Sequence, residues 1–121
     1  MFKQIRRLPE FDKDLKKLLK KYRTLEEDIK VFENTALKMY HKLNVEYDGI
    51  LPIANLGIEC PKIYKVKKFA CKALKGKGVQ SGIRIIYAYF PDDDIIEYIE
   101  TYHKNDKENE DHVRIFQYYK K

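Results

Sequence analysis

The chain has 121 residues, of which 44% are hydrophobic and 36% are charged, and its formal net charge at pH 7 is +6. This length predicts one small domain, residues 1–121, with a modest hydrophobic core. No run of eighteen apolar residues is present and the N-terminus lacks the apolar stretch of a secretory signal, so we expect neither a membrane span nor secretion. Cys60 and Cys71 are too few for a disulfide scaffold and have no metal-ligand neighbours at useful spacing, which favours a cytoplasmic protein with ordinary thiols.

The N-terminal third is predicted to form a strand followed by two helices. Phe2 to Leu8 alternates loosely between apolar and polar residues, and Pro9 after it is well placed to begin a helix. Apolar residues then recur at helical spacing, with acidic residues in the first turn and lysines in the later turns. Thr24 and Glu27 have the spacing of a capping box, which predicts a second helix that runs to about Leu43. Because almost no loop separates the two helices, we expect an antiparallel hairpin that packs on a sheet.

The rest of the chain is predicted to form strands and a last helix. The apolar segment Asp48–Pro61 contains glycines and prolines, and we expect an ordered loop packed on the core, with a partner-docking or lid segment as the alternative. Strands are predicted at Lys62–Phe69, Ile83–Phe90 and Ile95–His103. Asp106 is placed to cap a terminal helix. The order β-α-α-β-β-β-α is that of an α+β domain with a mostly antiparallel sheet and the helical hairpin on one face.

Charges are concentrated in two adjacent segments. Lys62–Phe90 carries eight basic residues and no acidic one, whereas Pro91–Asp111 carries nine acidic residues and two lysines. A cationic block on strands and a turn-rich loop is a common footprint for a phosphate backbone. We therefore expect nucleic acid or a ribonucleoprotein as partner. The residues predicted to position it are Lys62, Lys65, Lys67, Lys68, Lys72, Lys75 and Lys77.

Two stretches give the chain a recognisable pattern, Ser81–Phe90 and Ile99–Asn109. The first contains a Gly-x-Arg-apolar-apolar-Tyr strand, here Gly82, Arg84 and Tyr87. The second contains a strand that ends in His103 and Lys104. In this order the motifs resemble the RelE/ParE superfamily of bacterial toxins, and most of all its RelE- and HigB-like branch of ribosome-dependent messenger RNA endonucleases.

The resemblance implies the toxin component of a type II toxin–antitoxin module. Its partners would be the ribosome, messenger RNA and a cognate antitoxin that is acidic and partly unfolded when alone. It implies RNA cleavage by attack of a ribose 2′-hydroxyl on the adjacent phosphate, with no metal or other cofactor. That reaction requires loss of the 2′-hydroxyl proton, neutralisation of the phosphate oxygens and protonation of the leaving 5′-oxygen.

Three residues are predicted to meet these requirements. Arg84 would clamp the scissile phosphate, because its guanidinium offers two parallel donors. His103 would act as general acid or base, since a histidine side chain can exchange a proton near neutral pH. Lys104 would contact the phosphate or stabilise the transition state. The structural alternatives are an ion pair between Arg84 and Glu97 on a neighbouring strand, a packing or capping role for His103, and simple solvation for Lys104.

The remaining alternatives concern the tyrosines and the function as a whole. Tyr87 and Tyr102 are predicted to lie in the core, whereas Tyr118 and Tyr119 near the C-terminus could stack on a base. Two other functions stay open, a non-enzymatic inhibitor of DNA gyrase like the ParE branch and a basic RNA-binding module without catalysis.

Overall fold

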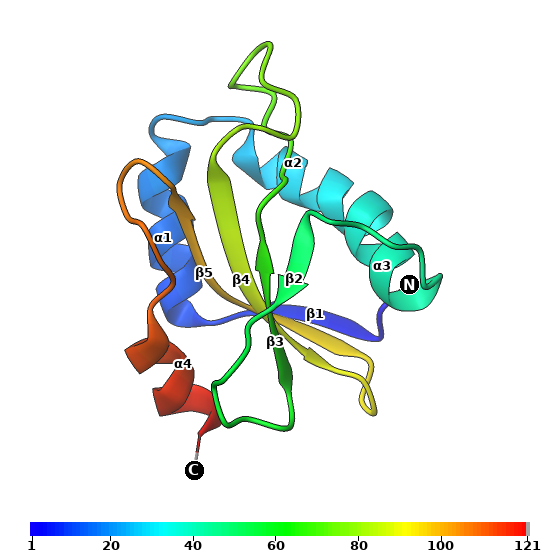
Figure 1. Cartoon of the computed structure of the whole chain (residues 1–121). Coiled ribbons are helices and arrows are strands. Elements are labelled where there is room, and N and C mark those ends of the chain that lie inside the picture. Colours follow the sequence, from blue (N-terminus) through cyan, green and yellow to red (C-terminus); the bar gives the residue numbers. More distant parts are fainter. Residues whose placement is uncertain (121) are drawn as a thin grey trace.

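The structure is a computed structural model that describes residues 1–120, and it contains a five-stranded sheet with helices on both faces (Figure 1). The sheet order is β1-β5-β4-β3-β2, with β1 parallel to β5 and all other pairs antiparallel. The predicted α+β fold with a mostly antiparallel sheet is therefore confirmed. No helix within residues 1–120 has the length and apolar character needed to cross a membrane. The elements in chain order are β1 (Gln4–Arg7), α1 (Pro9–Leu19), α2 (Leu25–Phe32), the π-helical turn η1 (Glu33–Leu37), α3 (Lys38–Lys42), β2 (Ile50–Pro52), β3 (Lys62–Val66), β4 (Ile83–Phe90), β5 (Ile95–His103) and α4 (His112–Tyr119).

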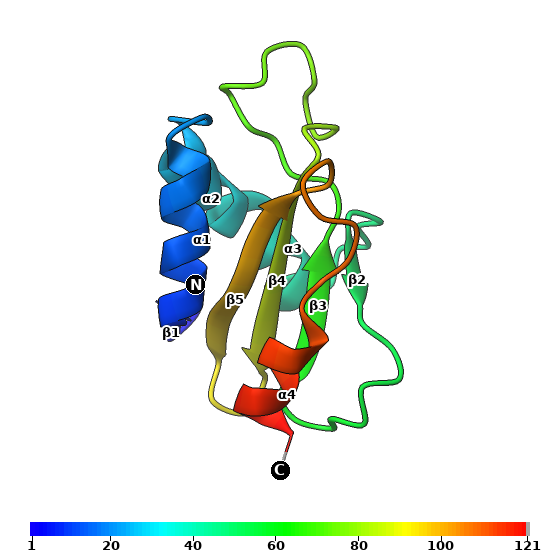
Figure 2. The same ribbon diagram turned by 90° about the vertical axis from the view of Figure 1, so that its left-hand side faces the viewer.

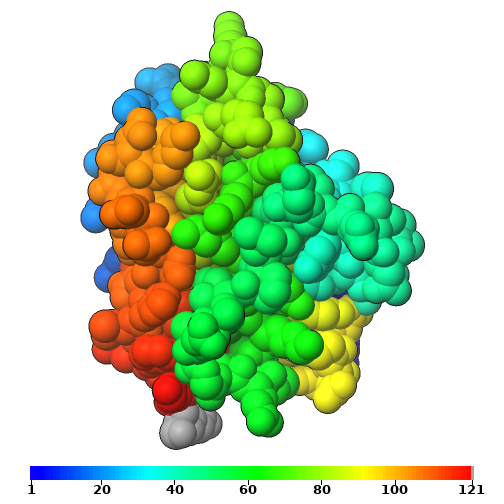
Figure 3. Space-filling model, viewed as in Figure 1, coloured from blue at the N-terminus to red at the C-terminus, as the bar shows by residue number. Residues whose placement is uncertain are grey.

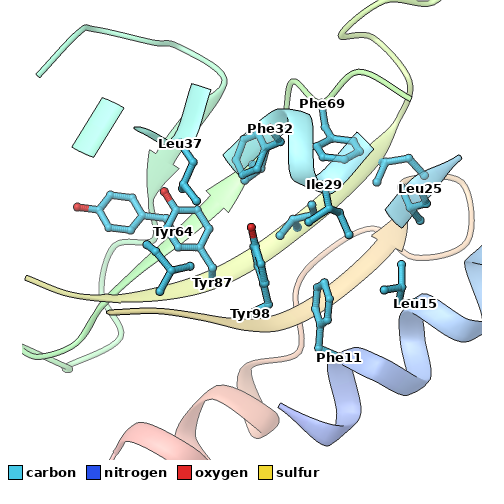
Figure 4. Close-up of a cluster of buried hydrophobic side chains, with 14 of the residues drawn as sticks. Phe11, Leu15, Leu25, Ile29, Phe32, Leu37, Tyr64, Phe69, Tyr87 and Tyr98 are labelled. Atoms are coloured by element: carbon cyan, nitrogen blue, oxygen red, sulfur yellow. The ribbon is translucent and has the colours of Figure 1, made fainter. Parts of the chain in front are cut away.

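One face of the sheet is covered by the two helical segments predicted from the sequence. Helix α1 begins with Pro9 and packs on β5, and the second segment runs without a break through α2, η1 and α3 (Figure 2). In Figure 1 the second segment leads away from α1 across the sheet, so the two helical segments cover different parts of the same face. The side chains between helices and sheet form the larger core, in which the rings of Phe11 and Tyr98 stack with centroids 5.0 Å apart (Figure 4).

The opposite face is only partly covered. Helix α4 lies over one end of it, and Ile115 of α4 packs against Ile86, Ala88 and Ile99 of the central strands. The segment that follows β2 supplies Leu56 to the same cluster. In Figure 3 the orange and red C-terminal part lies against the green segment, and the loop between β3 and β4 projects beyond the sheet. The uncovered end of this face carries the polar side chains considered below.

A β-bulge in β5 decides which side chains share a face. Pairing runs from Ile86 opposite Glu100 directly to Tyr87 opposite Tyr98, which leaves Ile99 as the extra residue. An extra residue shifts the alternation of all later side chains by one position. The residue pattern of Ile95–His103 predicts strict alternation, with Glu97 and His103 on one face. This prediction is wrong, because the bulge places them on opposite faces.

Three other local predictions were also wrong. The Thr24 side chain does not cap α2; its hydroxyl donates to Asp28 at 2.8 Å and accepts from the amide of Ala73 at 2.9 Å, because the loop before β4 docks on this helix start. Helix α4 is capped by Asp111, whose carboxylate accepts from the Arg114 amide at 3.0 Å, and not by Asp106. Strand β3 ends at Val66 and not at residue 69, since the next two amides donate to the carbonyl of Gly49 instead of continuing the ladder.

The segment 48–61 is ordered and packs on the core, as expected, but it also contains a strand. Residues 50–52 form β2, which pairs with β3 at the edge of the sheet. A strand of three residues, one of them a proline, is too short to give a periodic sequence signal, so the strand was not predicted.

Candidate functional site

Arg84 lies on the partly covered face, near the start of β4. Its Nη1 donates to the backbone carbonyl of Lys67 at 2.9 Å, and the side chain is half-buried. The alternative of an ion pair with Glu97 does not occur, because Glu97 binds Arg6 at 2.6 Å and the Tyr119 hydroxyl at 2.5 Å. Within residues 1–120 no carboxylate lies within ion-pair distance of the Arg84 guanidinium. Arg84 is thus held in position while its charge is still available to an anion.

Lys65 of β3 lies on the same face as Arg84, diagonally across the β3–β4 pair of strands. Its side chain forms an ion pair with Glu110 in the segment before α4. The Nζ to Oε1 distance is 3.0 Å, and both side chains are nearly buried. Burial alone would raise the pKa of Glu110, but hydrogen bonds from His112, from the backbone and from Lys65 lower it to about 2. Burial opposes the charge of Lys65 as well, but the hydrogen bond that Lys65 donates to Glu110 and the neighbouring Glu110 and Tyr102 oxygens together outweigh it, so the pKa of Lys65 is raised. Both groups are therefore charged at neutral pH.

A second ion pair completes this surface. Lys107 contacts Glu100 of β5, whose other oxygen accepts from the Asp111 amide at 2.8 Å. The acidic run of residues 106–111 lies between β5 and α4 and is not part of the last helix. It folds back from β5 and supplies both Lys107 and Glu110 to the sheet. Lys65, Lys67, Arg84, Lys107, Tyr102, Glu100 and Glu110 are called the cationic face below.

Tyr102 was predicted to lie in the core and was given no functional role. In the structure it belongs to the cationic face. It is paired with Arg84 across β4 and β5 and is 6% exposed. Its hydroxyl is buried and has no hydrogen-bond partner among residues 1–120. Burial raises the pKa of this phenol, and the neighbouring Lys65 charge opposes the rise. A buried phenol without a hydrogen-bond partner is unusual in a folded protein and calls for an explanation such as a catalytic role or an ordered water.

His103 does not join Arg84. The bulge turns it to the helix-covered face, where its ring stacks on Tyr22 with centroids 5.8 Å apart. Its Nδ1 accepts from the Asn105 amide at 3.1 Å, so Nε2 carries the proton and donates to the Ser81 carbonyl at 3.1 Å. A Cβ at Gly82 would lie 2.7 Å from Nε2, which explains the glycine of the motif. Both nitrogens are occupied, and this arrangement favours the packing alternative.

Lys104 and the seven predicted lysines are spread over the molecule. Lys104 is exposed in the turn after β5, and its amide donates to the Gly82 carbonyl at 2.9 Å. Lys65 and Lys67 lie beside Arg84, whereas Lys68 pairs with Asp48 at 2.7 Å and lines a groove near the helices. The lysines that remain are exposed, at the start of β3 for Lys62 and in the projecting loop for Lys72, Lys75 and Lys77.

The two C-terminal tyrosines lie at the other end of the partly covered face. Tyr118 donates to Glu10 at 2.7 Å and Tyr119 donates to Glu97 at 2.5 Å. Glu97 pairs with Ala88, four residues along β4 from Arg84. The tyrosines fasten α4 to the body of the protein, and the structure does not bring them to Arg84.

Comparison with known proteins gives one structural match. Neither a protein family model nor a curated protein sequence matches the chain. The fold is similar to a chain in the crystal structure of the archaeal RelE–RelB complex from Pyrococcus horikoshii OT3, with a TM-score of 0.51 and 15% sequence identity over 88% of this chain and 100% of that chain. The chain has a RelE-like fold. At this identity the similarity concerns the fold alone, and the chemistry has to be argued from the side chains.

Proposed function

We propose that the protein is the toxin of a type II toxin–antitoxin module and that it cleaves messenger RNA on the ribosome. The observation that carries the proposal is Arg84, a guanidinium fixed by a backbone carbonyl on an accessible sheet face, without a carboxylate partner among residues 1–120 and beside two lysines. The RelE-like fold supports the same assignment. The protein would act in the cytoplasm, on translating ribosomes, and a cognate antitoxin would hold it inactive.

The chemistry would be performed by side chains of the cationic face. Arg84 would clamp two oxygens of the scissile phosphate, and Lys65 and Lys67 would neutralise the charge that develops as the 2′-oxygen attacks. The Tyr102 hydroxyl is the group nearest to Arg84 in the sheet register that can both accept and donate a proton. Lys104, at the end of the same strand, would bind a neighbouring phosphate. His103 would act through position only, by fixing the turn around Gly82.

The test compares inducible expression of the wild type, Arg84→Ala and Arg23→Ala, with primer extension on a translated and an untranslated reporter transcript. Arg23 is an exposed arginine in the turn after α1, so its removal changes the net charge equally. We expect Arg84→Ala to lower cleavage by about 100- to 1,000-fold, because one preorganised donor to a transition-state anion is lost. Equal cleavage by all three proteins would exclude Arg84 from the site.

One observation favours a second candidate. Since Arg84 and His103 lie on opposite faces, the predicted catalytic set is not assembled, and a non-enzymatic inhibitor such as the ParE-type gyrase inhibitor could use the same face for binding alone. Growth arrest without cut transcripts, accompanied by a DNA-damage response, would support that candidate. Salt-sensitive RNA binding without growth arrest would indicate a basic RNA-binding module.

A further inference from the structure

The segment that joins β5 to α4, orange in Figure 2, returns over the sheet and places one more lysine, Lys107, on the cationic face. The Lys107 ammonium contacts Oε2 of Glu100 on β5 and lies 5.3 Å from the centre of the Tyr102 ring. The Lys107 side chain is 38% exposed, whereas that of Glu100 is 4% exposed. Lys107 is thus bound to a buried carboxylate and is still open to solvent.

Glu100 occupies a position at which an apolar side chain is the ordinary choice. It lies opposite Ile86 in the middle of the sheet, and a carboxylate is almost never so deeply buried unless it is paired. Its Oε1 accepts from the Asp111 amide at 2.8 Å, and its Oε2 accepts from Lys107. This one carboxylate therefore fixes both the backbone of the segment before α4 and the ammonium of Lys107.

The Lys107 ammonium has donors to spare. A lysine carries three N–H donors, and within residues 1–120 Lys107 has no acceptor besides Glu100. The face of the Tyr102 ring attracts the same charge through a cation–π contact, which favours this position of the ammonium. A cation held from two directions with unused donors is preorganised to bind an anion.

Three cations from three different elements converge on Tyr102. Arg84 of β4 is paired with Tyr102, and residues directly opposite each other in a sheet have Cβ atoms about 4.5–5.5 Å apart. Lys65 of β3 is near enough for its charge to oppose the rise in the pKa of the phenol. Lys107 reaches the ring from the segment after β5. The unpartnered hydroxyl of Tyr102 is therefore on a surface where an anion would meet several donors at once.

The proposed reaction builds negative charge at more than one oxygen. Arg84 would bind two oxygens of the phosphate, and the lysines of β3 would face the attacking 2′-oxygen. The attacking and departing oxygens lie roughly in line on opposite sides of the phosphorus. Since β3 and β5 flank β4 on opposite sides, a cation above β5 is placed for the departing oxygen. Lys107 is the lysine that the structure places there.

We infer that Lys107 is a further catalytic residue, which binds the departing 5′-oxygen of the scissile phosphate, and that Glu100 is its positioning residue. The inference rests on the proposed function, because a departing oxygen exists only if RNA is cleaved. As the bond from phosphorus to the 5′-oxygen breaks, the oxygen leaves with the electron pair. The Lys107 ammonium stabilises that charge and keeps its own proton, so proton exchange remains the task of Tyr102.

Single-turnover cleavage of a messenger RNA on purified ribosomes, with the full chain in excess, tests the inference. The rate at saturating protein reports the step on the ribosome, and the half-saturating concentration reports binding. The variants are Lys107→Ala, Lys107→Arg and Glu100→Gln. Lys16→Ala is the control, because it removes the same charge from an exposed position of α1 on the helix-covered face.

We expect Lys107→Ala to lower the saturating rate by about 100-fold, since one preorganised donor to a developing charge is lost. The half-saturating concentration should change less than about threefold, because the contact forms mainly in the transition state. Lys107→Arg keeps the charge and should retain about a tenth of the rate or more. Glu100→Gln loosens the ammonium and should lower the rate by about tenfold or more. Lys16→Ala should match the wild type.

Lys107→Ala leaves Glu100 buried without its cation, so the double variant Lys107→Ala/Glu100→Gln is measured as well. It removes both charges, and it should keep the urea midpoint and show the same loss of rate. A wild-type rate in this folded double variant would overturn the inference alone. A loss confined to the half-saturating concentration would also overturn it, because Lys107 would then serve binding only. If the wild type cleaves no RNA, the proposed function fails and the inference fails with it.

Discussion

On the helix-covered face of the sheet, histidine and tyrosine side chains are packed inside the protein and several form hydrogen bonds there, whereas the opposite face carries charged side chains in ion pairs. His41 Nε2 lies 2.6 Å from the Tyr87 hydroxyl, and Tyr98 donates to Glu33 at 2.9 Å. On the other face Lys65 pairs with Glu110 at 3.0 Å, and the Tyr102 hydroxyl has no partner among residues 1–120.

This difference separates structural from functional chemistry within a single sheet. A satisfied and largely uncharged network fixes one packing arrangement, because breaking any bond leaves a buried polar group alone. The ion pairs of the second face hold lysines, and a lysine can exchange a carboxylate for a phosphate. We therefore expect substitutions on the first face to change stability and substitutions on the second face to change binding or activity.

The largest effect is expected from Phe11→Ala on the helix-covered face. Phe11 is fully buried and stacks on Tyr98, so its loss should lower the free energy of unfolding by about 3–5 kcal/mol. That is a large part of the typical total of about 5–15 kcal/mol. Urea denaturation measures the change, and Tyr118→Ala, a 39% exposed tyrosine of α4, is the control. A loss of less than about 1 kcal/mol would mean that this face is not the main core.

Tyr102→Phe should separate stability from activity. The hydroxyl makes no hydrogen bond within residues 1–120, so its removal should leave the urea midpoint unchanged or slightly higher. If the phenol exchanges protons with the RNA, cleavage should fall by about 100-fold. Tyr87→Phe is the matched control, because it should lower stability through the lost contact with His41 and leave the cationic face intact. Unchanged cleavage by Tyr102→Phe would remove this residue from the proposed site.

Glu110→Gln should strengthen RNA binding by roughly two- to fivefold, since Lys65 loses its ion-pair partner and can contact one more phosphate. Fluorescence anisotropy between 50 and 200 mM salt measures the affinity for a single-stranded RNA oligonucleotide. The dependence of this affinity on salt should also become steeper, by the amount that corresponds to about one additional phosphate contact. Glu108→Gln makes the same charge change at an exposed position that has no ion pair within residues 1–120. Equal gains for both variants would show that only net charge matters.

An effect that appears only at acidic pH is expected from the pH dependence of stability through His41. Burial lowers the pKa of His41 from 6.5 to about 4, so the folded state resists a proton that the unfolded chain accepts. The contribution of His41 is therefore complete above pH 6.5 and decreases as the pH falls from 6.5 toward 4. The unfolding free energy of His41→Gln should vary less over this interval. Protonation of His41 near pH 6.5 by NMR would contradict the burial argument.

The sequence by itself determined the helices and strands whose apolar residues recur in a strong periodic pattern. The apolar stripe from Phe11 to Leu15 is buried on one side of α1, and the β-branched run of β4 is buried on both faces of the sheet. Both patterns specify an element whatever packs on it. The basic block and the position of Arg84 in a central strand were also readable, because net charge and strand type are local properties.

Only the tertiary structure decided which of these residues meet. The bulge at Ile99 sends His103 to the face opposite Arg84, and nothing in a run of alternating residues marks the position of one unpaired residue. The acidic run folds back so that Glu110 reaches Lys65, 45 residues away in the chain. Such pairings depend on the register of strands and on the path of a loop, and these are fixed by the packing of the whole sheet rather than by any local pattern.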